Sequence, residues 1–242
     1  MNTKSPARLA LLPLLALVCA AAAAATAPNT LTPDEKAAGW RLLWDGKTTD
    51  GWRGVKTDAF PAKDWIIKDG VLTVQAGDPG GDIITRERFS DFDLRLDFKI
   101  TPRANSGVKY FIQPGSNVGH EYQILDDERH PDAKLGRDGN RTLGSLYDLI
   151  APGAGKKTNP VGEWNTARIV VRGNHVEHWL NGQKILEYER GSPAFRELVA
   201  RSKFNKTPNF GEWPAGHILL QDHGDEVSYR NIKILVPVPA KH

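Results

Sequence analysis

The chain has 242 residues, a formal net charge of +3 and a single cysteine, Cys19. This length is enough for one large all-β domain or, at most, two small ones. The nearly neutral charge gives no reason to expect a nucleic acid or an anionic membrane surface as a partner. One cysteine cannot form a disulfide within the chain, so the fold must rely on its core.

The first 25 residues follow the order of a secretory signal peptide. Lys4 and Arg8 form a short basic region, an apolar run covers 9–19, and an alanine-rich stretch ends at Ala25, where cleavage fits an Ala-x-Ala site. A membrane anchor is the alternative, but the apolar run is too short to favour it. A lipid anchor on the cysteine is a second alternative, although the residues before it fit that motif poorly. We therefore predict a signal peptide at 1–25 and an exported protein, periplasmic or extracellular, with no membrane attachment after cleavage.

From residue 40 onward the sequence consists of short alternating runs separated by Gly, Asp, Asn and Pro, a pattern typical of all-β domains. The run 92–100 alternates strictly between apolar and charged residues, which indicates a half-buried strand. Asn181-Gly182 predicts a hairpin turn, and 195–202 is the best helix candidate. We expect the remaining strands at 71–75, 107–112, 121–125, 167–172, 176–180, 184–188, 217–221 and 227–235.

The fold class that follows is a two-sheet antiparallel β-sandwich. Residues 26–38 form an N-terminal extension, and 39–238 form a single domain with no internal repeat or linker. Residues 126–165 are a long stretch rich in Gly, Pro and charge, and long loops in compact domains tend to be functional. We expect long loops over a concave sheet, whose outer face then lines a groove.

Three strands place polar side chains between core residues, and we expect these polar side chains on the groove face. In the first strand the alternation predicts that Lys109 and Phe111 point outward, while Val108, Tyr110 and Ile112 point to the core. An ordinary surface lysine is the alternative interpretation of Lys109.

The second and third strands add a carboxylate, two amides and a histidine. Glu121 and Gln123 share an outer face, and Glu121 lies near Lys109 if the two strands pair. In such a pair each charge shifts the pKa of the other group, which can suit either residue to a catalytic role. Gln221 and His223 also point outward, a combination that suits hydrogen bonding to sugar hydroxyls. The alternatives are a solvated sheet face and, for His223, a structural histidine.

The loops offer further polar groups. Arg141, Tyr147 and Asp148 of the long loop either close over the groove or tie down the loop. His178 lies on a strand whose facing the sequence leaves open. We count all four as candidate substrate-binding residues.

The motifs of several enzyme and cofactor classes do not occur. There is no paired-carboxylate strand of the laminarinase type, no nucleophile elbow, no phosphate-binding glycine loop and no zinc spacing. We therefore expect no particular cofactor. A divalent metal ion is an alternative, with His130, Asp132, Glu121 and His223 as ligands whose spacing is not diagnostic.

A set of short motifs follows in order along the chain. The motifs are Gly39-Trp-Arg-Leu-Leu-Trp-Asp-Gly-Lys-Thr with Asp50-Gly-Trp52, Asn105-Ser-Gly107, Glu121-Tyr-Gln-Ile-Leu-Asp126, His130-Pro-Asp132, Leu146-Tyr-Asp-Leu-Ile150, Glu163-Trp-Asn165, His178-Trp-Leu-Asn-Gly182, and Leu220-Gln-Asp-His-Gly224 with Arg230-Asn-Ile232. Together they resemble the 3-keto-disaccharide hydrolase domain family, formerly a domain of unknown function, over roughly residues 39–235. Trp44 departs from the family pattern, in which phenylalanine is commoner.

The resemblance implies a concanavalin-A-like jelly roll that acts on glycosides already oxidised at C3, usually by a separate oxidoreductase. It does not fix the catalytic residues. A ketone at C3 acidifies the proton on C2, so a base can remove it, and the enolate then expels the group at C1. Water can add to the unsaturated sugar afterwards. Such a site needs a base, a positive or hydrogen-bonding group at the enolate oxygen, and an acid for the leaving group.

Our hypothesis makes His223 or Glu121 the base, and Lys109 either steadies the enolate or donates a proton. A divalent ion in place of Lys109 as the electrophile is an alternative. Gln123 and Gln221 position the sugar. The hypothesis requires that these five side chains share one sheet face. A non-catalytic carbohydrate-binding module is the alternative, because the jelly roll hosts many lectins. A structural domain of an extracellular assembly is a second alternative, which the polar rows disfavour.

Overall fold

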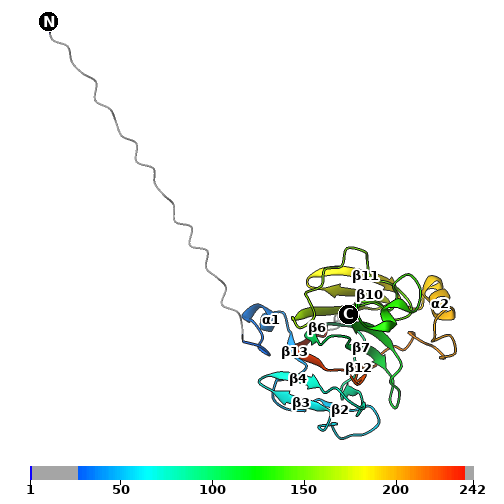
Figure 1. The fold of residues 1–242 in the computed structure, drawn as a ribbon, viewed down its shortest axis with the longest axis horizontal. Helices are drawn as coiled ribbons and strands as arrows, with labels where there is room; N and C mark the ends of the chain where they lie inside the picture. Colours follow the sequence, from blue (N-terminus) through cyan, green and yellow to red (C-terminus); the bar gives the residue numbers. More distant parts are fainter. Residues whose placement is uncertain (2–26, 238–242) are drawn as a thin grey trace, which may run out of the picture.

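The computed structural model describes Met1 and residues 27–237, so the predicted signal peptide lies outside the described residues except for Met1. Within this part of the chain the strands form two antiparallel sheets (Figure 1). The predicted two-sheet antiparallel β-sandwich is therefore confirmed. Among residues 27–237, none of the helices has the length and apolar character needed to cross a bilayer.

The larger sheet has eight strands in the order β11-β10-β9-β6-β13-β4-β3, with β1 beside β13. Figure 1 shows β10 and β11 at one side of this sheet and β3 and β4 at the opposite side. The strands are β1 Arg41–Leu42, β3 Trp65–Lys68, β4 Val71–Val74, β6 Phe92–Ile100, β9 Asn165–Arg172, β10 His175–Leu180, β11 Gln183–Glu189 and β13 Val227–Leu235.

The smaller sheet has five strands in the order β2-β5-β12-β7-β8. The strands are β2 Trp52–Gly54, β5 Ile83–Thr85, β7 Asn105–Ile112, β8 His120–Leu125 and β12 His217–Leu220. The helical segments are α1 Pro33–Ala37, η1 Pro131–Lys134 and α2 Pro193–Ala200. The prediction from the alternation missed β1, β2, β3 and β5, which have two to four residues and so hold few alternations. Of the strands this short, it covered only β4 and β12.

The core lies between the sheets, and β6 shows how the sequence builds it. Phe92, Leu94 and Phe98 are almost fully buried, and the alternate residues of the strand face outward. Burying one such large apolar side chain stabilises the fold by about 1.5–3 kcal/mol. A hydrogen bond joins the two sheets inside the core, where the Ser106 hydroxyl lies 2.6 Å from the Tyr229 hydroxyl.

The predicted facing of the last two residues of β7 is wrong. The register of the pairing between β7 and β12 shifts near the end of the strand, and Phe111 has a φ of 59°. This irregularity reverses the alternation, so Phe111 joins the main core, while Ile112 packs in a second apolar cluster with Leu219. Gly216 permits the close approach, because a Cβ there would lie 2.3 Å from the Phe111 Cα.

The long connection between β8 and β9 covers the edge of the smaller sheet. Its middle part pairs with β8 through the backbone. The Gln123 backbone amide donates to the Ser145 carbonyl (3.2 Å), and the Tyr147 backbone amide donates to the Glu121 carbonyl (3.0 Å). Tyr147 therefore takes the place of a residue on a neighbouring strand, beside Glu121. This pairing positions one wall of the candidate site.

Candidate active site

Lys109 and Glu121 form the centre of the site on the outer face of the smaller sheet. They are directly opposite each other on β7 and β8, and the Lys109 Nζ lies 3.7 Å from the Glu121 Oε2. Only 8% of Lys109 and 6% of Glu121 is exposed, which sets the pair apart from an ordinary surface ion pair. The predicted proximity of these two residues is confirmed.

Space for the carboxylate comes from a glycine on the neighbouring strand. Gly107 lies opposite Gln123, and a Cβ at Gly107 would be only 2.3 Å from the Glu121 Oε1. Any larger residue at this position would therefore displace the carboxylate. The Asn105-Ser-Gly107 motif thus has a steric role in the site.

The protonation of Glu121 is shifted by its surroundings. Burial raises the pKa of the Glu121 carboxyl above its usual range, although the Lys109 and Lys203 ammonium groups oppose the shift. A carboxylate with a raised pKa binds a proton more readily than an exposed one. Glu121 is therefore better suited to general base or acid catalysis than an exposed carboxylate.

Gln123 and Gln221 extend this polar surface. The Gln123 amide is buried, and the orientation that satisfies its hydrogen bonds places its nitrogen 3.0 Å from the Ser106 carbonyl and 3.3 Å from the Glu121 Oε1. The backbone amide of Gln221 donates to the Gly107 carbonyl (3.0 Å). Within the described part of the chain, the side-chain Oε1 of Gln221 has no hydrogen-bond partner. A buried acceptor without a donor favours a ligand hydroxyl or a water molecule beside it.

His223 lies at the end of the same face, just after β12. Its side chain is 46% exposed, and its Nδ1 is 3.9 Å from the Asp225 Oδ2. The Nε2 lies 3.5 Å from the Asn105 Nδ2, which links the ring to β7. His223 is also among the groups that oppose the upward shift of the Glu121 pKa. The ring is thus placed at the open margin of the site.

Arg141 and Asp148 hold the long loop in place. The Arg141 guanidinium contacts the Asp148 Oδ1 at 2.7 Å and the Asp132 Oδ1 at 2.9 Å, and the Tyr147 hydroxyl donates to the Asp132 Oδ2 at 2.8 Å. Of the two alternatives predicted for these residues, the contacts support tying down the loop. The Tyr147 backbone also pairs with Glu121, so this residue lies at the margin of the site.

His178 does not lie on this face. It has no exposed surface, and its Nε2 is 2.7 Å from the Tyr110 hydroxyl while its Nδ1 is 3.0 Å from the Gly144 carbonyl. Burial lowers the pKa of His178 to about 4, so the ring is neutral in the interior. This position corrects the expectation that His178 contacts a sugar, because Val176 and Leu180 on the same strand face are also buried.

Lys203, which follows α2, is a site residue that the sequence did not reveal. Its Nζ lies 4.1 Å from the centre of the Tyr147 ring, and its backbone amide donates to the Asp148 Oδ2 at 2.7 Å. Desolvation lowers the pKa of Lys203, while Glu121 opposes that shift. The residue lies in an irregular loop, where no alternation points to a facing.

The four candidate metal ligands do not form a compact set in the part of the chain that the structure describes. Asp132 is engaged by Arg141 and Tyr147, and the His130 and His223 rings are 6.2 Å apart. Among the described residues, a compact set is formed instead by His175, Glu177 and Glu187 on the outer face of the larger sheet. The Lys184 ammonium contacts both of these carboxylates, at 3.3 and 2.6 Å. The Lys184 ammonium thus already neutralises part of the negative charge that would bind a metal ion.

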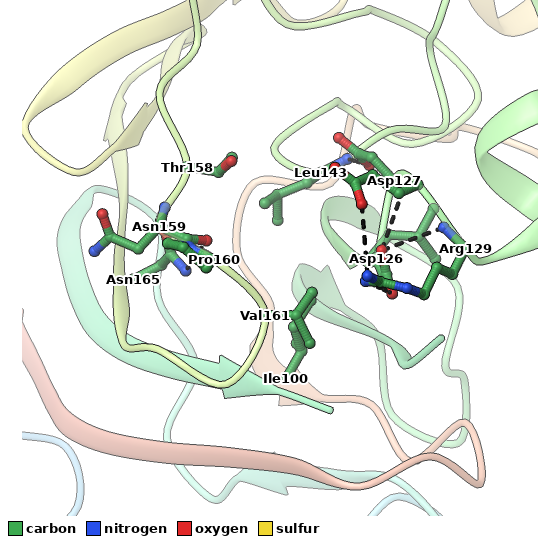
Figure 2. Close-up of a pocket in the computed structure, with 12 residues that line it drawn as sticks. Ile100, Asp126, Asp127, Arg129, Leu143, Thr158, Asn159, Pro160, Val161 and Asn165 are labelled. Carbon is green, nitrogen blue, oxygen red and sulfur yellow. Dashed lines mark hydrogen bonds and ion pairs between the residues drawn. The ribbon is translucent and has the colours of Figure 1, made fainter. Parts of the chain in front are cut away.

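A cavity of about 410 Å³ lies at another part of the sandwich (Figure 2). Asp126 and Arg129 stand on one side of it, and Asn159, Pro160 and Asn165 stand on the other. None of the predicted catalytic or substrate-binding residues lines it. The chemistry described above therefore belongs to the sheet face and not to this cavity.

Residues 39–235 match the family of 3-keto-alpha-glucoside-1,2-lyase-like domains. The chain belongs to this family. The curated 3-keto-disaccharide hydrolase of Bacteroides thetaiotaomicron is 37% identical over 234 residues, which cover 82% of this chain and 78% of that protein. The resemblance predicted from the ordered motifs is thus confirmed.

Solved structures agree with this placement. A proposed glycosyl hydrolase of Parabacteroides distasonis is 32% identical and aligns with a TM-score of 0.78, over 87% of this chain and 100% of that chain. A non-specific endo-beta-1,3(4)-glucanase is 12% identical and aligns with a TM-score of 0.50, over 86% of this chain and 99% of that chain. At that identity the glucanase shares the fold alone, which confirms the jelly roll.

Proposed function

We propose that this protein cleaves 3-keto-glycosides, including 3-keto-disaccharides, and that Lys109, Glu121 and His223 carry out the reaction. The observation that carries the proposal is the buried Lys109–Glu121 pair, with its Nζ–Oε2 distance of 3.7 Å and the raised pKa of Glu121. The 37% identity to a 3-keto-disaccharide hydrolase supports the choice of substrate.

The proposed reaction begins with transfer of the C2 proton to the Glu121 carboxylate. The C–H electrons form the C2–C3 double bond of an enolate, whose oxygen faces the Lys109 ammonium. The enolate then re-forms the ketone, a C1–C2 double bond appears, and the C1–O bond breaks. His223 is placed to give a proton to the departing oxygen, because it lies at the open margin of the site.

Hydration can complete the cleavage. The oxygen of water adds to C1 of the unsaturated ketone and gives one proton to His223, which has lost its own to the leaving group, while C2 takes the proton held by Glu121. The product is then a 3-keto-sugar, and without this step it is the unsaturated sugar. The site residues Gln123 and Gln221 would hold the hydroxyls of the ring during both steps.

The test is turnover of a 3-keto-glucoside by Lys109→Ala, Glu121→Ala and His223→Ala, with aglycone release and sugar products separated by chromatography. We expect each variant to lose about 100-fold or more in kcat. Near-normal turnover by all three variants would remove the proposed site. Binding of the substrate by the unaltered protein without release of aglycone would instead support a carbohydrate-binding module.

We also propose that the protein acts outside the cytoplasm, after removal of residues 1–25. The order of basic, apolar and small residues at the N-terminus supports this location. Cell fractionation followed by N-terminal sequencing tests it, with Thr26 expected as the first residue. A cytoplasmic protein that retains its leader would contradict the proposal.

A further inference from the structure

A second cavity, of about 330 Å³, adjoins the active-site face of the smaller sheet. Its walls come from the chain after β2, the chain before β5, the β7–β8 loop and the chain after β12. Its volume falls within the range of about 300–1,000 Å³ that is usual for small-molecule sites. None of the proposed catalytic residues lines it, so the reaction does not account for it.

The chain and its contacts connect this cavity to the reacting groups. Asn117 lines the cavity, and its backbone carbonyl accepts from the Lys109 Nζ at 3.5 Å. The Asn117 side chain in turn donates to the Asp82 Oδ2 at 3.3 Å. Asp222, another lining residue, directly follows Gln221. A ligand in the cavity would therefore lie next to the Lys109–Glu121 pair.

The polar groups of the cavity differ in how firmly they are held. The Asp222 carboxylate accepts from the Gly80 and Gly81 amides at 2.8 and 3.0 Å, so it fixes the wall. Lys56 is exposed, and within residues 27–237 its ammonium forms no hydrogen bond or ion pair. Asp82 is partly exposed and offers a carboxylate near the exposed Asn117 amide. Donors and acceptors thus face the same space.

We propose that this cavity is the subsite for the leaving group, and that it takes a second sugar ring. The inference rests on the proposed function, because it assumes that the oxidised ring occupies the face with Lys109 and Glu121. A ring with several hydroxyls can use the Lys56 donor and the Asp82 and Asn117 acceptors together, while its C–H faces meet Val55 and Pro79. No aromatic side chain of the described residues lines the cavity, so hydrogen bonds and not ring stacking select the occupant.

The experiment compares two substrates that differ only in the leaving group, a 3-keto-disaccharide and methyl 3-keto-glucoside. Lys56→Ala and Asn117→Ala are the test variants, and Lys68→Ala is the matched control, because Lys68 is exposed at the end of β3 in the other sheet. We expect kcat/KM for the disaccharide to fall about tenfold more than for the methyl glycoside, mainly through KM. The control should leave the ratio of the two substrates unchanged.

Equal losses on both substrates, or no loss on either, would overturn the subsite while leaving the proposed function intact. Absence of turnover of both substrates by the unaltered protein would instead overturn the proposed function. Thermal unfolding separates these results from misfolding, since an exposed and unpaired lysine should change stability by about 0.5 kcal/mol or less on removal.

Discussion

The outer faces of the two sheets both carry charged residues, but the geometry of their ion pairs differs. On the larger sheet the Arg168 guanidinium, 30% exposed, binds the buried Asp93 carboxylate through two contacts, at 2.8 and 2.6 Å, and Arg95 lies 3.8 Å from the same carboxylate. On the smaller sheet Lys109 and Glu121 are buried and 3.7 Å apart. The first arrangement is a close bidentate pair, and the second is a looser pair in a dry setting.

The pKa shifts follow from this difference. The hydrogen bonds to Asp93 raise the pKa of Arg168, so the larger sheet favours the charged form of its residue. Burial raises the pKa of Glu121, so the smaller sheet disfavours the charged form. A charge that its surroundings favour contributes to stability, whereas a disfavoured carboxylate has a stronger tendency to take up a proton. The outer face of the larger sheet therefore serves stability, and that of the smaller sheet serves the chemistry.

The largest expected effect is on turnover. Glu121→Gln should lower kcat on a 3-keto-glucoside by about 1,000-fold, because the amide cannot accept the C2 proton. Asp93→Asn, the matched change on the larger sheet, should change kcat by less than about twofold, since the residue touches no reacting group. Steady-state kinetics measures both. Similar kcat values for the two variants would end the distinction between the faces.

The second effect is on stability. Lys109→Met should lower the free energy of unfolding by about 3 kcal/mol, because it leaves the Glu121 carboxyl buried without its cation. Adding Glu121→Gln to this variant should restore part of the loss, since a neutral pair needs no counter-charge. Urea unfolding of the two singles and the double gives the coupling. Strictly additive losses would show that the pair does not interact.

The third effect is on the pH dependence of kcat/KM. The proposed base works only when ionised, so kcat/KM should fall as the pH drops through the Glu121 pKa, at a pH above the ordinary carboxyl value of 4.5. Lys203→Met removes a cation that lowers this pKa, and the fall should then occur at higher pH. An unchanged profile in the variant would mean that Lys203 does not act on Glu121 or that another group is the base.

The smallest effect is on the larger sheet. Arg168→Met should lower the melting temperature by about 2–4 °C, corresponding to about 1 kcal/mol, because Arg168 is itself 30% exposed and the Arg95 guanidinium, 3.8 Å from the buried Asp93 carboxylate, remains as its cation. Differential scanning calorimetry measures the shift, and kcat should stay within about twofold of normal. A large loss of activity would show that this face does not serve stability alone.

The sequence was informative where alternation was long and regular. The nine residues of β6 showed their facing directly, and the parity of β7 and β8 put Lys109 and Glu121 on outer faces, close together if the strands pair, as they do. The same reasoning failed at Phe111, because a register shift between two strands depends on long-range packing that a single run does not contain. For His178 a signal was present: Val176 and Leu180 flank it with the parity of buried residues. Lys203 reaches the site from an irregular loop, and only the fold brings it there.

Gly107 ties the chemistry of one strand to the sequence of the next. The missing side chain leaves the volume that the Glu121 carboxylate occupies, since even a methyl group would come within 2.3 Å of its Oε1. We therefore expect the residues at these two positions to vary together. A family member that lost the acid would be free to replace the glycine, and one that kept the acid would not. Among uncharacterised relatives, an alanine or larger residue at this position would mark chains that have given up the reaction while keeping the fold.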